Sequence, residues 1–108
     1  METYVQKIKL KKGSEEKVKE WAHYFKKNHD KVKQLIQNEG VLVESAFLDK
    51  DGDNTYLFYY MKVKDRAKMR EVFQKSDDPI DVYHKNFMNE VIDETYEMKP
   101  LIDFYSIE

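Results

Sequence analysis

The sequence predicts one α+β domain whose elements follow the order β-α-β-β-α-β. Three observations predict this class: a strand pattern opens the chain, two strongly strand-like segments flank a turn in its middle, and helical stripes separate that middle from both ends. A chain of 108 residues has the usual length of one domain with one core. We therefore expect residues 1–108 to form a single domain.

The first strand is expected at residues 4–10, where apolar and polar residues alternate imperfectly. A Lys-Lys-Gly break follows, and Ser14 can then cap a helix because its hydroxyl can accept from a free backbone N–H. Two glutamates come next, where the positive end of the helix dipole favours acids. These residues predict that a helix begins directly after Ser14.

That helix is predicted to end at Gly40, a residue that adopts a left-handed conformation at low cost. Its apolar residues recur at steps of three, four and seven from Val18 to Ile36, which places them on one stripe facing a core. Residues 28–30 (Asn-His-Asp) fall on a weak point of the stripe. A kink and two abutting helices are the alternatives there.

A hairpin is predicted in the middle of the chain. Residues 41–48 are dense in β-branched and apolar side chains, and residues 55–63 carry the strongest strand signal of the sequence. Between them, residues 49–54 (DKDGDN) have the composition of a turn, and Gly52 can take a positive φ without steric cost.

The last third of the chain predicts two helices and a strand. Asp65 can cap the first helix, which Pro79 ends because proline cannot continue a helical ladder. Asp78 can cap the next helix, with Pro79 in its first turn. That helix presents four apolar residues on one face: Ile80, Tyr83, Phe87 and Val91. Residues 101–107 (LIDFYSI) are expected to supply the final strand.

This order predicts a ferredoxin-like four-stranded antiparallel sheet with helices on one face. The third strand nevertheless carries apolar side chains on both faces, with Phe58 on one side and Leu57 and Met61 on the other. A second apolar face is too large to leave in water. We therefore expect a twofold homodimer in which the two sheets cover each other and form a dimeric α+β barrel.

Together, the element order, the length and the aromatic hairpin resemble the dimeric α+β barrel superfamily. That superfamily includes antibiotic-type monooxygenases and L-rhamnose mutarotases. Residues 39–63 (EGVLVESAFLDKDGDNTYLFYYMKV) and 77–87 (DDPIDVYHKNF) also resemble a small uncharacterised bacterial family. The mutarotase layout matches in a first helix that ends at a glycine. The paired tryptophans of the mutarotases' last helix are replaced here by Tyr83-His84 and Phe87.

Charge and composition argue against several classes of partner. The net charge is −2 with both signs interspersed, so no broad positive surface is expected to bind nucleic acid. No apolar run is long enough to cross a membrane, and no leader pattern opens the chain. The absence of cysteine excludes disulfides and thiolate sites and fits a reducing compartment. We therefore expect a cytoplasmic protein without a nucleic-acid or membrane partner.

One candidate site lies on the sheet. Three apolar residues are expected to face the helices: Ile8, Val43 and Phe47. Alternation then turns Lys7, Glu44 and Tyr59 to the other side, toward the barrel lumen. A lysine and a carboxylate are costly on a sheet face unless they are paired or solvated. They can bind a ligand there, or they can form a structural salt bridge or a polar dimer contact.

A second candidate site lies on the helix after Pro79. His84 is a candidate general base near neutral pH, and Asp81, three residues earlier, can orient it. Tyr83 and Phe87 are the neighbouring aromatic residues and candidate ligand contacts. In the alternative interpretation, Asp78 is a helix cap and His84 is a half-exposed residue satisfied by solvent or by Asp81.

Metal and cofactor sites are not expected. His23 and His29 are six residues apart and do not share a helix face, so they do not form a zinc pair. The aspartates around Gly52 lack the glutamate and flanking helices of a calcium loop. No phosphate-binding glycine loop or nucleophile elbow is present in the sequence.

Three functional hypotheses remain open. The first is a dimer that binds a small apolar or aromatic metabolite in the barrel lumen. The second is a cofactor-free enzyme of the monooxygenase or mutarotase kind, with His84 as base, Tyr59 as orienter and Glu44 as acid. The third is a structural protein whose barrel is filled by its own side chains. The sequence leaves open whether the protein is an enzyme.

Overall fold

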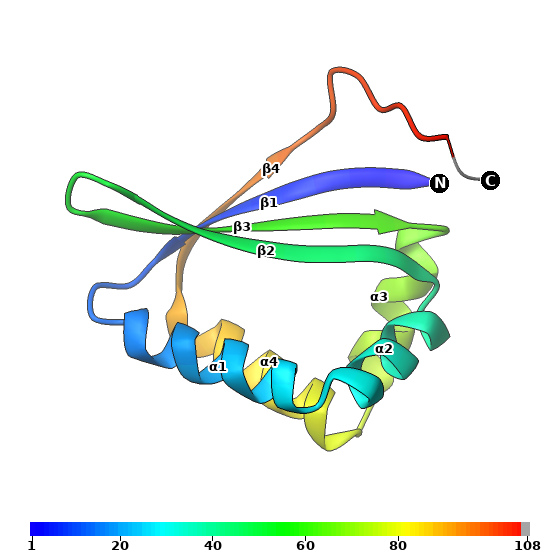
Figure 1. The fold of residues 1–108 in the computed structure, drawn as a ribbon, viewed down its shortest axis with the longest axis horizontal. Coiled ribbons are helices and arrows are strands. Elements are labelled where there is room, and N and C mark those ends of the chain that lie inside the picture. The colour runs from blue at the N-terminus through cyan, green and yellow to red at the C-terminus, as the bar shows by residue number, and fades with distance from the viewer. Residues whose placement is uncertain (107–108) are drawn as a thin grey trace.

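The computed structural model describes residues 1–106, which form a four-stranded antiparallel sheet covered on one face by helices (Figure 1). The elements along the chain are β1 (Glu2–Leu10), α1 (Glu15–Lys27), α2 (His29–Asn38), β2 (Val41–Asp51), β3 (Asn54–Val63), α3 (Arg66–Lys75), α4 (Pro79–Val91) and β4 (Ile92–Met98). The strand order is β2-β3-β1-β4. The predicted ferredoxin-like α+β class is confirmed, and the two helices predicted in the last third of the chain are α3 and α4.

The first helical region divides at Asn28, where α1 ends and α2 begins. The backbone of Asn28 leaves the helical region at φ −105° and ψ 31°, and its side-chain Nδ2 donates to the carbonyl oxygen of Tyr24 at 2.8 Å. A side-chain amide that bonds locally to the backbone competes with the helical ladder. Of the two alternatives at this point, the structure has two abutting helices.

Two of the three predicted helix caps form side-chain hydrogen bonds. Asp65 accepts from the N–H of Lys68 at 3.1 Å, and Asp78 accepts from the N–H of Ile80 at 2.9 Å. Ser14 occupies the N-cap position of α1, but its side chain makes no capping hydrogen bond. Pro79 begins α4, as its fixed φ favours.

The hairpin between β2 and β3 has the predicted turn, but a bulge reverses the predicted faces of β2. Gly52 has a φ of 62° in a two-residue connection between Asp51 and Asn54. The pairing register shifts between Val41 and Val43, so Val41 is buried among the helices while Val43 pairs beside Lys62. The expectation that Val43 and Phe47 face the helices is therefore wrong, whereas Ile8 is buried as expected.

The final strand is β4, not the predicted segment at residues 101–107. Residues 101–106 lie outside any strand, and Ile107 lies outside the described residues. The backbone passes directly from α4 into β4, and six of its seven residues pair antiparallel with β1. Four of the seven residues of β4 are polar (Asp93, Glu94, Thr95 and Glu97), which is common in an edge strand, so the more apolar residues 101–107 were predicted as the strand in its place.

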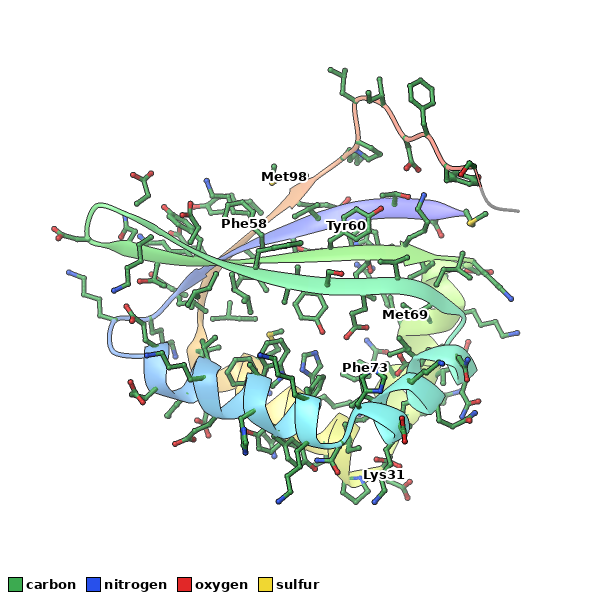
Figure 2. The ribbon with its side chains drawn as sticks, viewed as in Figure 1. Lys31, Phe58, Tyr60, Met69, Phe73 and Met98 are labelled. Atoms are coloured by element: carbon green, nitrogen blue, oxygen red, sulfur yellow. The ribbon has the colours of Figure 1, made fainter. Side chains whose placement is uncertain are left out.

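The C-terminal segment after β4 crosses the sheet face that lies opposite the helices, which we call the outer face (Figure 1). Asp103 forms a salt bridge of 3.0 Å with Lys62, and the Lys62 Nζ lies 4.1 Å from the centre of the Tyr105 ring. Phe58, Tyr60 and Met98 also lie on the outer face (Figure 2). Phe47, on the same face, is 60% exposed, and Phe104 of the segment is 88% exposed.

The core fills the space between the sheet and the helices. Leu57, Val63 and Val91 are its most completely buried residues, and Trp21 lies among them as its register with Val18 predicts. No helix within residues 1–106 combines the length and the apolar character that a membrane crossing requires. The fold therefore leaves one buried layer under the helices and one partly exposed sheet face.

Candidate functional site

A cavity of about 90 Å³ lies between the sheet and the helices. Eight apolar side chains line most of it, among them Met69 and Phe73 of α3, which lie in the space between the two layers (Figure 2). Five ionisable side chains complete the lining: Glu39, Glu44, Tyr59, Asp81 and His84. A mainly apolar cavity with a few convergent polar groups is the usual form of a small-molecule site.

Glu44 and Tyr59 reach the cavity from adjacent strands. In the β2–β3 register Tyr59 pairs with Ala46 and Glu44 pairs with Met61, so the two side chains are diagonal neighbours on one sheet face. The Tyr59 hydroxyl donates a short hydrogen bond to Oε2 of Glu44. Burial raises the pKa of Glu44, and this hydrogen bond opposes the rise. Burial also raises the pKa of Tyr59, so the phenol keeps its proton near neutral pH.

His84 enters the cavity from α4 and is held by Trp21. The indole Nε1 of Trp21 donates to Nδ1 of His84 at 2.9 Å, and the two rings stack with centroids 5.8 Å apart. Burial lowers the pKa of His84 to about 4, so the ring is neutral at pH 7. Because an indole N–H can only donate, Nδ1 is the acceptor and the single ring proton lies on Nε2. His84 thus offers the cavity a hydrogen-bond donor.

We predict that His84 is the Nε2–H tautomer from pH 5 to pH 8. Its folded pKa lies below the ordinary value, so its neutral form contributes stability above about pH 6.5 and that contribution is lost as the pH falls toward 4. Long-range proton–nitrogen NMR correlations of ¹⁵N-histidine protein report the tautomer directly. The exposed His23 provides a reference histidine signal in the same spectra. A His84 ring that gains its second proton between pH 6 and 7 would contradict the prediction.

Glu39 and Asp81 are buried carboxyl groups at one end of the cavity. They are 8% and 6% exposed, and neither side chain forms a hydrogen bond or salt bridge within residues 1–106. Burial raises the pKa of Glu39 to about 8, and the carboxylates of Asp81 and Glu44 add to the rise. At pH 7 the Glu39 side chain is therefore mainly a neutral acid, next to groups that carry or share negative charge.

Glu39 is not among the site residues predicted from the sequence. This residue caps the C-terminal end of α2, immediately before Gly40. Carboxylates are disfavoured at the negative end of a helix dipole, so an acid in this position was the signal in the sequence that could have indicated a functional residue. The dipole also acts in the same direction as burial, because both favour the protonated acid.

The structure brings together four of the seven predicted site residues: Glu44, Tyr59, Asp81 and His84. They meet on the helix-covered face of the sheet, so the predicted position of Glu44 and Tyr59 on the lumen side is wrong. For Glu44 the prediction fails because the bulge in β2 exchanges the two faces of that strand. The partner of the His84 ring is also different from the predicted one, because Trp21 takes the place expected for Asp81.

The other three predicted residues lie outside the cavity lining. Lys7 is on the outer face, with its Nζ 4.6 Å from the centre of the Tyr56 ring. Phe87 is a core residue whose ring stacks on Trp21 at a centroid distance of 5.0 Å. Tyr83 packs against Tyr24 with ring centroids 4.2 Å apart. Each therefore has a structural contact in place of a direct contact with the cavity.

A larger groove of about 660 Å³ lies at the opposite end of the sheet, next to the β2–β3 turn. Its lining comes from the loop after β1 and from the turn, and it includes the exposed residues Lys11, Lys12 and Asp53. No buried ionisable side chain lines it within residues 1–106. Size alone therefore does not make it the better candidate.

Neither the cavity nor the rest of residues 1–106 contains three or more histidine, aspartate or glutamate side chains grouped to hold a metal ion. The carboxyl groups of the cavity can act as acids, bases and hydrogen-bond partners. A protonated acid near an ionised one supplies a donor and an acceptor in one enclosed space.

Comparison with known proteins supports the fold and gives a family. The structure is similar to the crystal structure of an L-rhamnose mutarotase from Formosa agariphila, with a TM-score of 0.52 and 22% sequence identity. The match covers 99% of this chain and 100% of the mutarotase chain, and at this identity it establishes a shared fold. No curated protein sequence matches the chain. A family model matches residues 1–108, and the chain therefore belongs to DUF6176, a family of unknown function.

Proposed function

We propose that the protein binds a small molecule in the cavity between the sheet and the helices. The observation that carries this proposal is the pair of buried carboxyl groups, Glu39 and Asp81, which have no protein partner in the described chain. Both residues line the cavity, so a ligand there can supply the hydrogen bonds that the described chain does not give them.

The size of the cavity limits the ligand. Its volume of about 90 Å³ is well below the roughly 300–1,000 Å³ of sites for drug-sized molecules. A ligand of a few non-hydrogen atoms, with an apolar part against Met69 and Phe73 and a polar part against the carboxyls, fits this lining. This proposal replaces the barrel lumen of the sequence-based hypothesis with the helix-covered face of the sheet.

Trp21 offers a direct test of binding. It is the single tryptophan of the chain, and its indole N–H bonds to His84 in the cavity wall. We expect its fluorescence to change in a saturable way when a panel of small alcohols, ketones, amines and carboxylic acids is added. The ligand that binds should also shift the NMR signals of Met61 and Met69, which line the same cavity.

A cavity-filling variant distinguishes this site from any other. Val32→Phe adds volume inside the lining and should abolish the response to ligand. The matched control, Val82→Phe, places the same ring at an exposed position of α4 and should leave the response unchanged. The proposal fails if no member of the panel alters Trp21 emission, or if the filled variant responds as the native protein does.

A second candidate is a cofactor-free enzyme that transfers protons, as a sugar mutarotase does. It is favoured by the neutral Glu39 acid beside Asp81, together with the Nε2–H of His84, because ring opening and closing need a proton donor and a proton acceptor. The fold shared with an L-rhamnose mutarotase supports the same reaction class. Exchange NMR between the anomers of L-rhamnose tests it, with the sugar reaching the carboxyls from a surface groove of about 320 Å³ that Glu39 and Asp81 also line. An exchange rate equal to that without protein would exclude catalysis, and equal rates for the native protein and Asp81→Asn would exclude a role of Asp81.

We further propose that the outer face forms a homodimer interface. Phe47, Tyr96 and Met98 are 60%, 49% and 46% exposed on strands of one sheet. Contiguous apolar surface of this kind is rarely left in water. Sedimentation of the native protein at micromolar concentration is therefore expected to give twice the chain mass of 13.1 kDa.

A charge on this surface should separate the subunits. Phe47→Asp is expected to give a folded 13.1 kDa species, because an aspartate would be buried without a partner in the interface. Val82→Asp, at an exposed position on the helical side, is the control and should remain dimeric. A native protein that sediments as a monomer at this concentration would contradict the dimer.

A further inference from the structure

We propose that the ligand of the cavity is a small aliphatic amine, bound as its ammonium cation between the carboxyl groups of Glu39 and Asp81. This inference rests on the proposed small-molecule-binding function and adds the chemical class of the ligand. It follows from the arrangement of charged groups around the cavity and from the way the cavity meets the surface.

The two carboxyl groups are built into the wall and face the cavity. More than nine-tenths of each residue is buried, since Glu39 is 8% exposed and Asp81 is 6% exposed. Glu39 comes from the end of α2 and Asp81 from the first turn of α4, so two separate elements bring them to one space. Glu44, the third carboxyl, already accepts the hydroxyl of Tyr59. Glu39 and Asp81 are thus the acceptors that have no donor in the described chain.

No lysine or arginine lines the cavity to balance these acids. Lys85, the nearest cation along α4, donates to the carbonyl oxygens of Gln74 and Ser76 at 3.2 and 3.0 Å. Lys75 of α3 forms a salt bridge of 2.9 Å with Glu71. His84 is neutral because burial lowers its pKa to about 4. The cavity therefore has acceptors and negative charge but no cation of its own.

The carboxyl groups of Glu39 and Asp81 lie where the cavity approaches the surface. Leu35, Glu39 and Asp81 line both the cavity and a neighbouring surface groove of about 320 Å³. A molecule that enters from this groove passes both carboxyl groups. Glu39 holds its proton at pH 7, so the negative charge there comes from the neighbouring carboxylates, and it favours a cation over an anion at the point of entry.

The remainder of the lining fits an organic cation. Within residues 1–106 no group of three or more histidine or acidic side chains is arranged to hold a metal ion. Phe25, Phe73 and the thioethers of Met61 and Met69 offer aromatic and polarisable surfaces. Such surfaces favour the alkyl part of an amine, and aromatic faces also attract its charge. An ammonium with a short aliphatic chain therefore matches both ends of the cavity.

Binding of an ammonium should be linked to proton release. The charged and titratable groups that face Glu39 are Glu44 and Tyr59 from the sheet and Asp81, His84 and Lys85 from α4, with Lys75 of α3 at the rim. Burial and the neighbouring carboxylates raise the pKa of Glu39 to about 8, so it holds a proton at pH 7. An adjacent ammonium favours the ionised form and so displaces that proton.

Three probes of nearly equal size test the class of ligand: isobutylamine, isobutanol and isobutyrate. Their binding is measured at pH 7 by Trp21 fluorescence and by calorimetry in two buffers of different ionisation enthalpy. We expect the amine to bind at least about tenfold more tightly than the alcohol, because charge-assisted hydrogen bonds are the stronger ones. The amine should release protons on binding, and isobutyrate should bind least.

Glu39→Gln provides the matched variant, since it keeps the shape of the side chain and removes the acid. It should reduce amine affinity about tenfold, abolish proton release and leave alcohol affinity unchanged. Asp81→Asn should have the same effect on the affinities, so the test does not depend on one variant. Glu20→Gln, an exposed change on α1, is the control and should behave as the native protein.

The outcomes separate this inference from the proposed function. If isobutanol or isobutyrate binds as tightly as the amine, or if the amine binds equally well to both acid-to-amide variants, the ammonium class is wrong while the cavity remains a ligand site. If none of the three probes changes Trp21 emission or produces heat, the inference is wrong for ligands of this size. Failure of the whole panel of small ligands would then overturn the proposed function as well.

Discussion

Replacing Glu39 by glutamine is expected to stabilise the protein at pH 8.5 by on the order of 2 kcal/mol, because the carboxyl is partly screened by solvent, while changing its stability at pH 4.5 by less than about 0.5 kcal/mol. The side chain is 8% exposed, and burial with its neighbouring carboxylates raises its pKa from 4.5 to about 8. The unfolded chain therefore loses the Glu39 proton several pH units before the folded protein does. Glutamine has no proton to lose and avoids the cost of a buried charge.

The sign of this effect follows from proton linkage. A group whose folded pKa is raised contributes stability below its unfolded pKa and loses that contribution as the pH rises through the folded value. For Glu39 the loss extends from about pH 4.5 to about pH 8. His84 has the opposite slope between about pH 6.5 and 4, but its contribution is common to both proteins and cancels in the difference.

Urea unfolding of both proteins at pH 4.5, 6.5 and 8.5 measures this prediction. The difference in the free energy of unfolding should grow steadily with pH. Glu20→Gln, which removes an exposed acid, should show no such growth. A Glu39→Gln variant that is less stable than the native protein at pH 8.5 would mean that the carboxylate has a partner in the folded state.

Replacing Tyr59 by phenylalanine is expected to lower the free energy of unfolding by about 2 kcal/mol at pH 7. Tyr59 is 7% exposed, and its hydroxyl is the hydrogen-bond donor to the buried carboxyl of Glu44. The variant keeps the ring and its packing against Trp21, whose centroid is 6.0 Å away, but leaves Glu44 without this donor. Because the hydrogen bond favours the ionised acid, its loss should also raise the pKa of Glu44 further.

Tyr60→Phe is the matched control for this variant. Tyr60 is the next residue of the same strand, lies on the outer face and should tolerate the change with less than about 0.5 kcal/mol of destabilisation. A double-mutant cycle with Glu44→Gln then isolates the pairwise contribution of the hydrogen bond. Equal stabilities of the Tyr59→Phe and Tyr60→Phe variants would contradict the role assigned to the Tyr59 hydroxyl.

The elements that could be predicted from the sequence were those whose signals are local. The apolar stripe from Val18 to Ile36, the turn at Gly52 and the caps at Asp65 and Asp78 each depend on neighbouring residues, and the structure confirms them. The break at Asn28 could be located but not resolved into a kink or two helices. That choice depends on the side-chain amide, which bonds to the carbonyl of Tyr24.

The faces of β2 and the identity of the last strand could not be predicted in this way. A single bulge between Val41 and Val43 exchanges the two sides of the strand, and alternation read from the sequence cannot detect it. The edge strand β4 is polar, with burial limited to its first residue, so its position is set by pairing with β1. Pairing between strands as far apart in the sequence as β1 and β4 cannot be recognised from the pattern of neighbouring residues.

Four residues of the candidate site could be predicted from the sequence, and Glu39 could not. Four ionisable residues were predicted as site residues because such groups are unusual near apolar ones. The structure brings all four to one cavity: Glu44, Tyr59, Asp81 and His84. Their common location depends on the bulge and on the break in the first helical region. Glu39 was missed because its importance arises from burial beside Asp81, which comes from a helix 40 residues later in the chain.

The proposed site depends on the state of Glu39, which should be a protonated acid next to the second carboxyl, that of Asp81. Carbon-13 NMR of the side-chain carboxyl groups, followed from pH 3 to pH 10 and assigned with Glu39→Gln, measures this most directly. We predict that the Glu39 signal titrates with a pKa of about 8. A Glu39 carboxyl that titrates near 4.5, as an exposed glutamate does, would contradict the account.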